Sequence, residues 1–125
     1  MTNLLEVLEM EILEVSEGYA KVQMPVTDKV KQPFGYLHGG ASMALGETAC
    51  SVGAAHMVDT NKVIPVGLEM NTNHIRSATE GYVYAIAKII HGGKSTQVWN
   101  INIVDEHNQI ISVMRGTMML KPRRS

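Results

Sequence analysis

Residues 38–58, HGGASMALGETACSVGAAHMV, form the segment from which the architecture of this chain follows. Small residues dominate residues 41–58, which predicts a smooth helix that is buried on most of its circumference. Glu47 is the only formally charged residue between Lys31 and Asp59. Burying a lone carboxylate costs several kcal/mol unless the group is hydrogen-bonded, paired or partly solvated. The sequence therefore indicates a chemical role for Glu47.

Strand patterns flank this helix on both sides. Before it, two strands are predicted at residues 8–15 and 19–25, separated by a turn at hairpin spacing. Residues 27–37 have no clean period and predict a loop. After the helix, four more strands are predicted, at residues 63–75, 81–91, 95–105 and 109–120, and apolar and polar residues alternate in the strand that contains Trp99. Their short polar connectors predict that consecutive strands pair antiparallel.

These elements predict an α+β architecture in which one long central helix is wrapped by a curved antiparallel sheet of about six strands. This layout resembles that of a hotdog fold. Because 125 residues is the size of one domain and no linker or repeat interrupts the pattern, we expect a single domain over residues 1–125.

Bulk properties exclude several classes of function. The net charge of −1 gives no overall basic field, so no nucleic-acid partner is expected. No apolar run approaches the roughly 18 residues of a membrane span, and the acidic N-terminus is unlike a secretory signal, so a cytoplasmic location is predicted. The single Cys50 excludes an internal disulfide framework. No histidine has a ligand spacing to another metal-binding residue, so no metal or cofactor is expected.

The segment GYLHGG at residues 35–40, followed by Glu47, strongly resembles the hotdog-fold acyl-CoA thioesterases. More narrowly, it is similar to the branch that contains phenylacetyl-CoA, hydroxybenzoyl-CoA, dihydroxynaphthoyl-CoA and enterobactin-proofreading thioesterases. The resemblance covers nearly the whole chain and includes HIRSATEG at residues 74–81. It implies hydrolysis of an acyl-CoA thioester, with an aromatic acyl group and a catalytic carboxylate on the central helix.

The resemblance also implies roles for individual residues. Glu47 would be the catalytic base or nucleophile, and Gly40 the backbone donor to the thioester carbonyl. Gln32 and His38 would be polar groups near that carbonyl, and Ser51 a partner of Glu47 or its water. The residues implied in binding CoA are Arg76, Ser77, Gly93, Lys94 and Ser95.

Thioester hydrolysis needs an oxygen nucleophile and a donor for the charge that develops on the carbonyl oxygen. A helix N-terminus offers unpaired N–H groups, and a glycine such as Gly40 lets a substrate approach them closely. Glu47 could activate water, or attack the carbonyl itself to form a mixed anhydride. The sequence leaves both routes open.

The separation of Gly40 and Glu47 has a consequence for assembly. Seven residues span about 10.5 Å along a helix, too far for both groups to serve one carbonyl. We therefore expect a homodimer in which each site combines Gly40 of one chain with Glu47 of another. A homotetramer is implied by the resemblance alone.

Other interpretations of the same residues stay open at this point. The enzyme could act on carrier-protein or medium-chain acyl thioesters, or the domain could bind acyl-CoA without catalysis. A hotdog dehydratase usually needs a differently placed histidine and acid pair, which the sequence does not offer. Glu47 could also be a structural acid paired with a cation, and His38 could serve only the backbone at the helix start.

Overall fold

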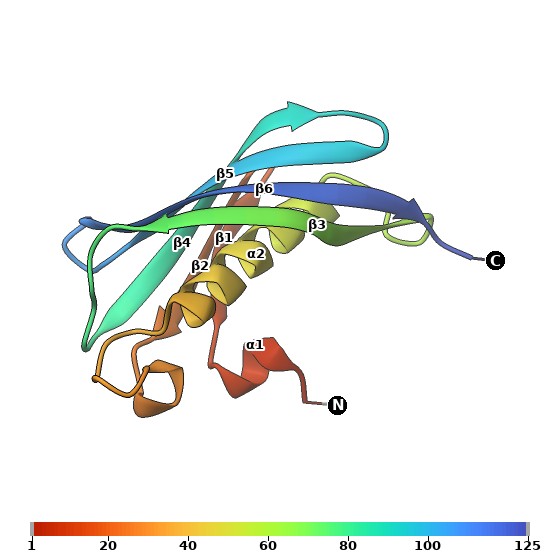
Figure 1. The fold of residues 1–125 in the computed structure, drawn as a ribbon. Coiled ribbons are helices and arrows are strands. Elements are labelled where there is room, and N and C mark those ends of the chain that lie inside the picture. The colour runs from red at the N-terminus through yellow and green to blue at the C-terminus, as the bar shows by residue number, and fades with distance from the viewer. Residues whose placement is uncertain (1, 125) are drawn as a thin grey trace.

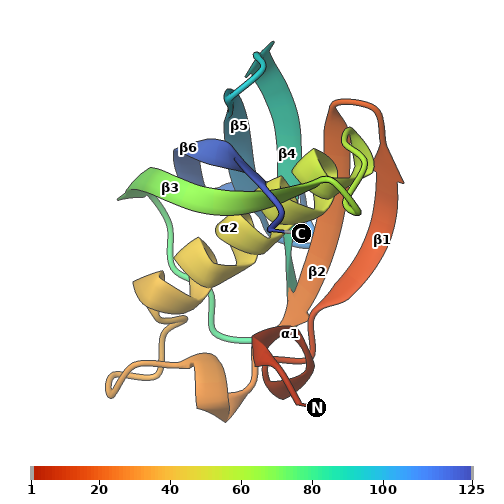
Figure 2. The same cartoon turned by 90° about the vertical axis from the view of Figure 1, so that its right-hand side faces the viewer.

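The computed structural model describes residues 2–124. In chain order its elements are the helix α1 (Leu4–Val7), the strands β1 (Glu11–Ser16) and β2 (Tyr19–Pro25), the 3-10 turn η1 (Asp28–Val30), the helix α2 (Gly39–His56), and the strands β3 (Val63–His74), β4 (Tyr82–Gly92), β5 (Thr96–Val104) and β6 (Ile110–Pro122). Figures 1 and 2 show α2 lying along the inner face of the curved sheet, as predicted. Within residues 2–124, no helix is long and apolar enough to cross a membrane.

The six strands form one antiparallel sheet in the order β1-β2-β4-β5-β6-β3. The predicted pairing of consecutive strands holds for β1 with β2, β4 with β5 and β5 with β6, but it is wrong for β3. This strand pairs with β6 at the edge of the sheet, because β2 and β5 occupy both sides of β4. The connector at residues 75–81 instead bonds the loop before α2, where Leu37 N–H donates to Ala78 O at 2.8 Å.

The N-terminal segment differs from the prediction in two ways. Residues 4–7 form the short helix α1, which the sequence pattern did not reveal, and β1 begins at Glu11 rather than at residue 8. Leu8 ends the helix, and Glu9 has a φ of 58°, which lies outside the range of regular strand residues. The loop predicted at residues 27–37 contains the single turn η1.

The core lies between the sheet and one face of α2. Alternate residues of three central strands point inward, which confirms the predicted half-buried strands: Ala20, Val22, Met24, Val83, Ala85, Ala87, Trp99, Ile101 and Ile103. Glycines on α2 let the large side chains of this layer reach the helix backbone. A Cβ atom at Gly53 would lie 2.5 Å from Cη2 of Trp99, and one at Gly46 would overlap Sδ of Met114.

Burial on α2 is confined to that face, so the expectation of a helix buried on most of its circumference is wrong for the single chain. The buried positions recur every three or four residues: Ser42, Leu45, Gly46, Ala49, Cys50, Gly53 and Ala54. The opposite face is made of small residues and carries Glu47, which is exposed. A partly solvated carboxylate avoids the cost of burial and stays available for chemistry.

Candidate active site

Glu47 lines a mainly apolar cavity of about 470 Å³ on the outer face of α2. The residues that line it are Leu4, Leu5, Ala44, Glu47, Thr48, Ser51, Val52 and Ala55. Glu47 is the only charged group among them, and Ser51 lies one helical turn further along the same face. The structure thus brings the predicted pair Glu47 and Ser51 to one cavity, as the resemblance implies.

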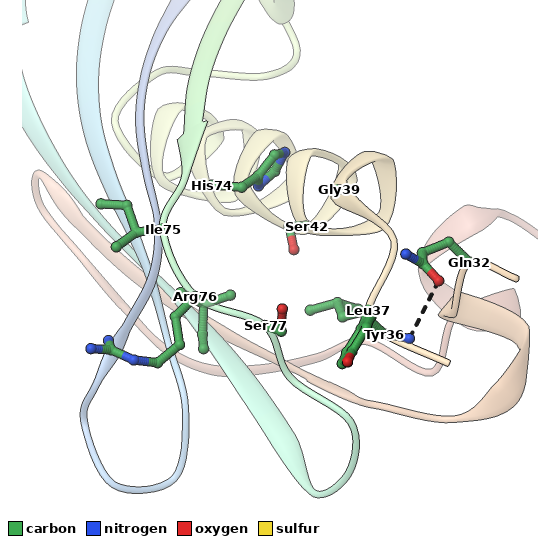
Figure 3. Close-up of a pocket in the computed structure, with 10 residues that line it drawn as sticks. Gln32, Tyr36, Leu37, Gly39, Ser42, His74, Ile75, Arg76 and Ser77 are labelled. Carbon is green, nitrogen blue, oxygen red and sulfur yellow. Dashed lines mark hydrogen bonds between the residues drawn. The ribbon is translucent and has the colours of Figure 1, made fainter. Parts of the chain in front are cut away.

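A second cavity, of about 280 Å³, lies at the N-terminal end of α2 (Figure 3). Its lining residues are Gln32, Tyr36, Leu37, Gly39, Ser42, His74, Ile75, Arg76, Ser77 and Ile111. Three of the predicted site residues, Gln32, Arg76 and Ser77, meet here. The two cavities have no lining residue in common, so one chain holds Glu47 apart from the polar groups at the helix start.

The side chain of Gln32 is oriented by the loop that contains it. Its Oε1 accepts hydrogen bonds from the N–H groups of Phe34 at 2.5 Å and Tyr36 at 3.5 Å. With the carbonyl oxygen used in this way, the amide nitrogen remains as a donor at the edge of the cavity (Figure 3). Gln32 is therefore equipped to donate a hydrogen bond to a substrate oxygen.

His38 caps α2 by accepting a hydrogen bond from the N–H of Gly40, the group that was predicted as the oxyanion donor. The N–H of Gly40 donates to Nδ1 of His38 at 2.8 Å, and Gly40 does not line the cavity. Nδ1 is thus an acceptor, which leaves the proton of a neutral ring on Nε2. In this arrangement His38 serves the backbone of the helix start.

Gly39 is the glycine that faces the cavity. Among residues 2–124, no acceptor forms a hydrogen bond with its N–H. A Cβ atom at Gly39 would lie 2.6 Å from Nε2 of His74, so the imidazole rests directly on this glycine. Nδ1 of His74 is 2.7 Å from Oγ of the fully buried Ser112, which holds the ring in place. An unpaired N–H and an imidazole therefore converge at the first turn of α2.

The residues predicted to bind CoA do not come together in one chain. Arg76 and Ser77 line the cavity at the start of α2, and Nη1 of Arg76 donates to Ile110 O at 2.8 Å. The turn at residues 93–95 lies at the other end of the sheet, where Leu120 N–H donates to Ser95 O at 2.8 Å. Leu120 pairs with residue 65 of β3. Residue 65 is 11 positions from Arg76, which is about 37 Å along an extended chain at about 3.4 Å per residue, so Arg76 and the turn at residues 93–95 lie far apart in one chain.

Cys50 lies on the inner face of α2, beneath Glu47. Burial and the nearby negative charge of Glu47 raise the pKa of this thiol to about 12. The group stays protonated at neutral pH and is no nucleophile. Among residues 2–124, no cluster of three or more histidine, cysteine or acidic side chains could hold a metal ion.

Among the residues that line these cavities, sequence reasoning assigned no role to Gly39, His74, Leu4 or Leu5. Sequence alone does not distinguish Gly39 from Gly40. The structure does, because the hydrogen bond to His38 uses the N–H of Gly40 and not that of Gly39. His74 ends a predicted strand and begins the HIRSATEG segment, which is a signal for a functional residue at a strand end. Leu4 and Leu5 belong to a helix too short to leave a periodic pattern.

A long central helix wrapped by an antiparallel sheet, with a lone acid on the helix face turned away from that sheet, is the arrangement of a hotdog-fold thioesterase. The chain belongs to the thioesterase superfamily, whose family profile matches residues 34–112.

Relatives in two bacteria are similar over most of the chain. A 1,4-dihydroxy-2-naphthoyl-CoA hydrolase of Listeria monocytogenes is 48% identical over 119 residues, which cover 95% of this chain and 96% of the relative. A 1,4-dihydroxy-2-naphthoyl-CoA hydrolase of Escherichia coli is 40% identical over 115 residues, which cover 92% and 84%. The crystal structure of the Q32A mutant of thioesterase SAV0944 from Staphylococcus aureus superposes with a TM-score of 0.95 at 62% identity, covering 97% of this chain and 100% of that one.

Proposed function

We propose that this protein hydrolyses the thioester of an aromatic acyl-CoA, with Glu47 as the general base or nucleophile. The observation that carries the proposal is the place of Glu47, an exposed carboxylate that is the only charged group in the lining of a mainly apolar cavity. An apolar cavity of about 470 Å³ is within the usual range for small-molecule sites and suits an uncharged acyl group. The names of the Listeria and Escherichia coli relatives support an aromatic ester of CoA.

Two routes use the same carboxylate. As a base, Glu47 takes a proton from water while the water oxygen attacks the carbonyl carbon, and the tetrahedral oxyanion collapses with loss of the CoA thiolate. As a nucleophile, Glu47 attacks the carbon directly, the thiolate leaves, and water opens the mixed anhydride. Thiolate is a good leaving group, so neither route needs a strong general acid.

The N–H of Gly39 is the better candidate for the oxyanion donor. Gly39 lines the cavity and its N–H has no acceptor among residues 2–124, whereas the N–H of Gly40 donates to His38. The donor lies at the positive end of the α2 dipole, which favours a developing negative charge. The amide of Gln32 and the imidazole of His74 line the same cavity and can complete the oxyanion site.

Two copies of the chain would build each complete site. Within one chain, Glu47 and the helix-start groups lie in separate cavities, and β3 leaves its outer edge unpaired within residues 2–124. Glu47 contacts Gly67 in the middle of β3, and Gly39 contacts His74 at its end. An antiparallel pair of β3 strands that places Gly67 of each copy near His74 of the other would join the two halves of both sites. Pairing of such dimers into a tetramer remains a prediction.

The same pairing would reunite the groups proposed to bind CoA. Because the two copies run antiparallel, the Arg76 end of one copy lies toward the end of the other that carries residues 93–95. The guanidinium of Arg76 and the ammonium of Lys94 would then flank the phosphates of one ligand. A cytoplasmic location also remains a prediction from the sequence.

The test is CoA release by the wild type and Glu47→Gln, measured on naphthoyl, benzoyl, phenylacetyl and straight-chain esters. The proposal predicts the highest kcat/KM on aromatic esters and a loss of at least about 100-fold in the variant, with folding intact. High turnover of a loaded carrier protein with none of CoA esters would favour a carrier-protein thioesterase. Tight binding of acyl-CoA with no turnover in the wild type would instead favour a binding protein.

A further inference from the structure

The short helix α1 stands apart from the sheet. It is one turn long, and none of its residues is buried. Leu4 is 52% exposed and Val7 is 48% exposed, although both are large apolar residues. Figure 1 shows α1 on the side of α2 that faces away from the sheet. Apolar side chains in this place have no core to enter, which calls for another explanation of their position.

Residues on either side of this turn hold α1 in place. At its start, Oδ1 of Asn3 accepts a hydrogen bond from Glu6 N–H at 3.1 Å. Beyond its end, Leu8 and Met10 pack against the core, and Oε2 of Glu9 lies 2.8 Å from Nζ of Lys29. The helix is thus anchored by its flanks rather than by packing of its own leucines onto α2.

The space left between α1 and α2 is the cavity that contains Glu47. Leu4 and Leu5 form one wall, and the small side chains of Ala44 and Ala55 belong to the other. Short side chains on α2 keep the cavity open. An apolar ligand in this cavity would remove the apolar walls from contact with water, which lowers the free energy of the complex. The cavity therefore favours an apolar ligand.

We propose that Leu4 and Leu5 are specificity-determining residues that cover the acyl group and select large, uncharged acyl groups. The inference rests on the proposed function, because it assumes that the thioester carbonyl lies at Glu47. A large ring system that extends from Glu47 reaches α1 and is covered by the two leucines. A short acyl group ends before α1 and gains nothing from them.

The experiment compares Leu5→Ala with Val7→Ala. Val7 is the control because it is an apolar residue of the same turn that does not line the cavity. Two quantities are measured for each variant: kcat/KM for 2-naphthoyl-CoA, and the inhibition constant of free CoA, which has no acyl group. Leu5→Ala should lower kcat/KM by about 10-fold or more, mainly through KM, and leave the inhibition constant within about twofold. Leu5→Met should restore most of the loss because it restores the volume.

Several results would overturn the inference. One is an equal kcat/KM in Leu5→Ala and Val7→Ala. Another is a rise in the inhibition constant of free CoA as large as the fall in kcat/KM, which would indicate a general loss of structure. A change in mass of Leu5→Ala by light scattering would assign the leucines to contact between copies instead. If wild-type turnover is absent or survives Glu47→Gln, the proposed function fails; if turnover needs Glu47 but ignores Leu5, only this inference fails.

Discussion

Glu47 of α2 rests against Gly67 of β3 so closely that a Cβ atom at position 67 would overlap Oε2 of the carboxylate. Gly67 lies where the register between β3 and β6 shifts, at a bulge before Glu69. Bulges next to active sites often re-aim a neighbouring group. The bare backbone at Gly67 therefore sets where the carboxylate can point.

Gly67→Ala should lower kcat by about 10-fold or more, because displacing a catalytic oxygen by about 1 Å is enough for such a loss. The variant should keep its thermal stability, because the atom that the new Cβ meets is the end of the exposed and flexible Glu47 side chain, which can move aside. Steady-state kinetics and a melting curve measure both quantities. In a Glu47→Gln background the same substitution should cause no further loss, and an additive loss would show that Gly67 acts through something other than the carboxylate.

His74→Ala should lower kcat by about 10- to 100-fold with little change in KM, because the imidazole lies beside the proposed oxyanion donor Gly39. Ser112→Ala should give a smaller loss of the same kind, since Ser112 only positions the ring. The double variant should be no worse than His74→Ala alone. Losses confined to KM, or losses that multiply, would contradict this linkage.

Arg76→Ala should raise KM for CoA esters and leave the same acyl esters of short pantetheine thiols nearly unchanged. The reason is that short thiols lack the phosphates that the guanidinium is proposed to hold. Arg76 also bonds the carbonyl of Ile110, so a structural role is a real alternative. Equal losses on both kinds of ester would establish that alternative.

Gly53→Ala should destabilise the fold by about 1–3 kcal/mol, although alanine favours a helix by about 1 kcal/mol over glycine. The added methyl would lie 2.5 Å from Cη2 of Trp99, which is fully buried and bonded through Nε1 to Gln97. Denaturant unfolding followed by tryptophan fluorescence measures the effect. In a Trp99→Phe background, followed by circular dichroism, the cost should shrink, because phenylalanine lacks the atoms in contact with position 53. An undiminished cost would place the strain elsewhere.

Much of the fold could be predicted because it depends on local sequence patterns. The alternation in 19–25 and in the Trp99 strand identified half-buried strands, and small residues identified the central helix to within two residues at each end. The edge position of β3 could not be predicted, since it depends on which sides of β4 are already occupied. The open face of α2 was also missed, because a run of small residues does not reveal on which side the sheet lies.

The candidate site likewise combines residues with a local sequence signal and residues whose place depends on tertiary structure. Glu47 could be found because a lone charge in a small-residue helix is conspicuous in sequence. The choice between Gly39 and Gly40 depends on the side chain of His38, and two adjacent glycines give no sequence signal for it. The wall formed by Leu4 and Leu5 depends on where the chain after α1 is anchored, which is a tertiary feature.

In the proposed dimer, each site takes Glu47 from one copy and the helix-start groups from the other. The most direct measurement mixes two impaired proteins, Glu47→Gln and Gln32→Ala, after dissociation and reassembly. If sites are shared, each mixed dimer contains one intact site, and the mixture should recover about a quarter of wild-type activity. If one chain holds the whole site, every site carries a substitution, and the mixture would stay at the average of its two impaired parents.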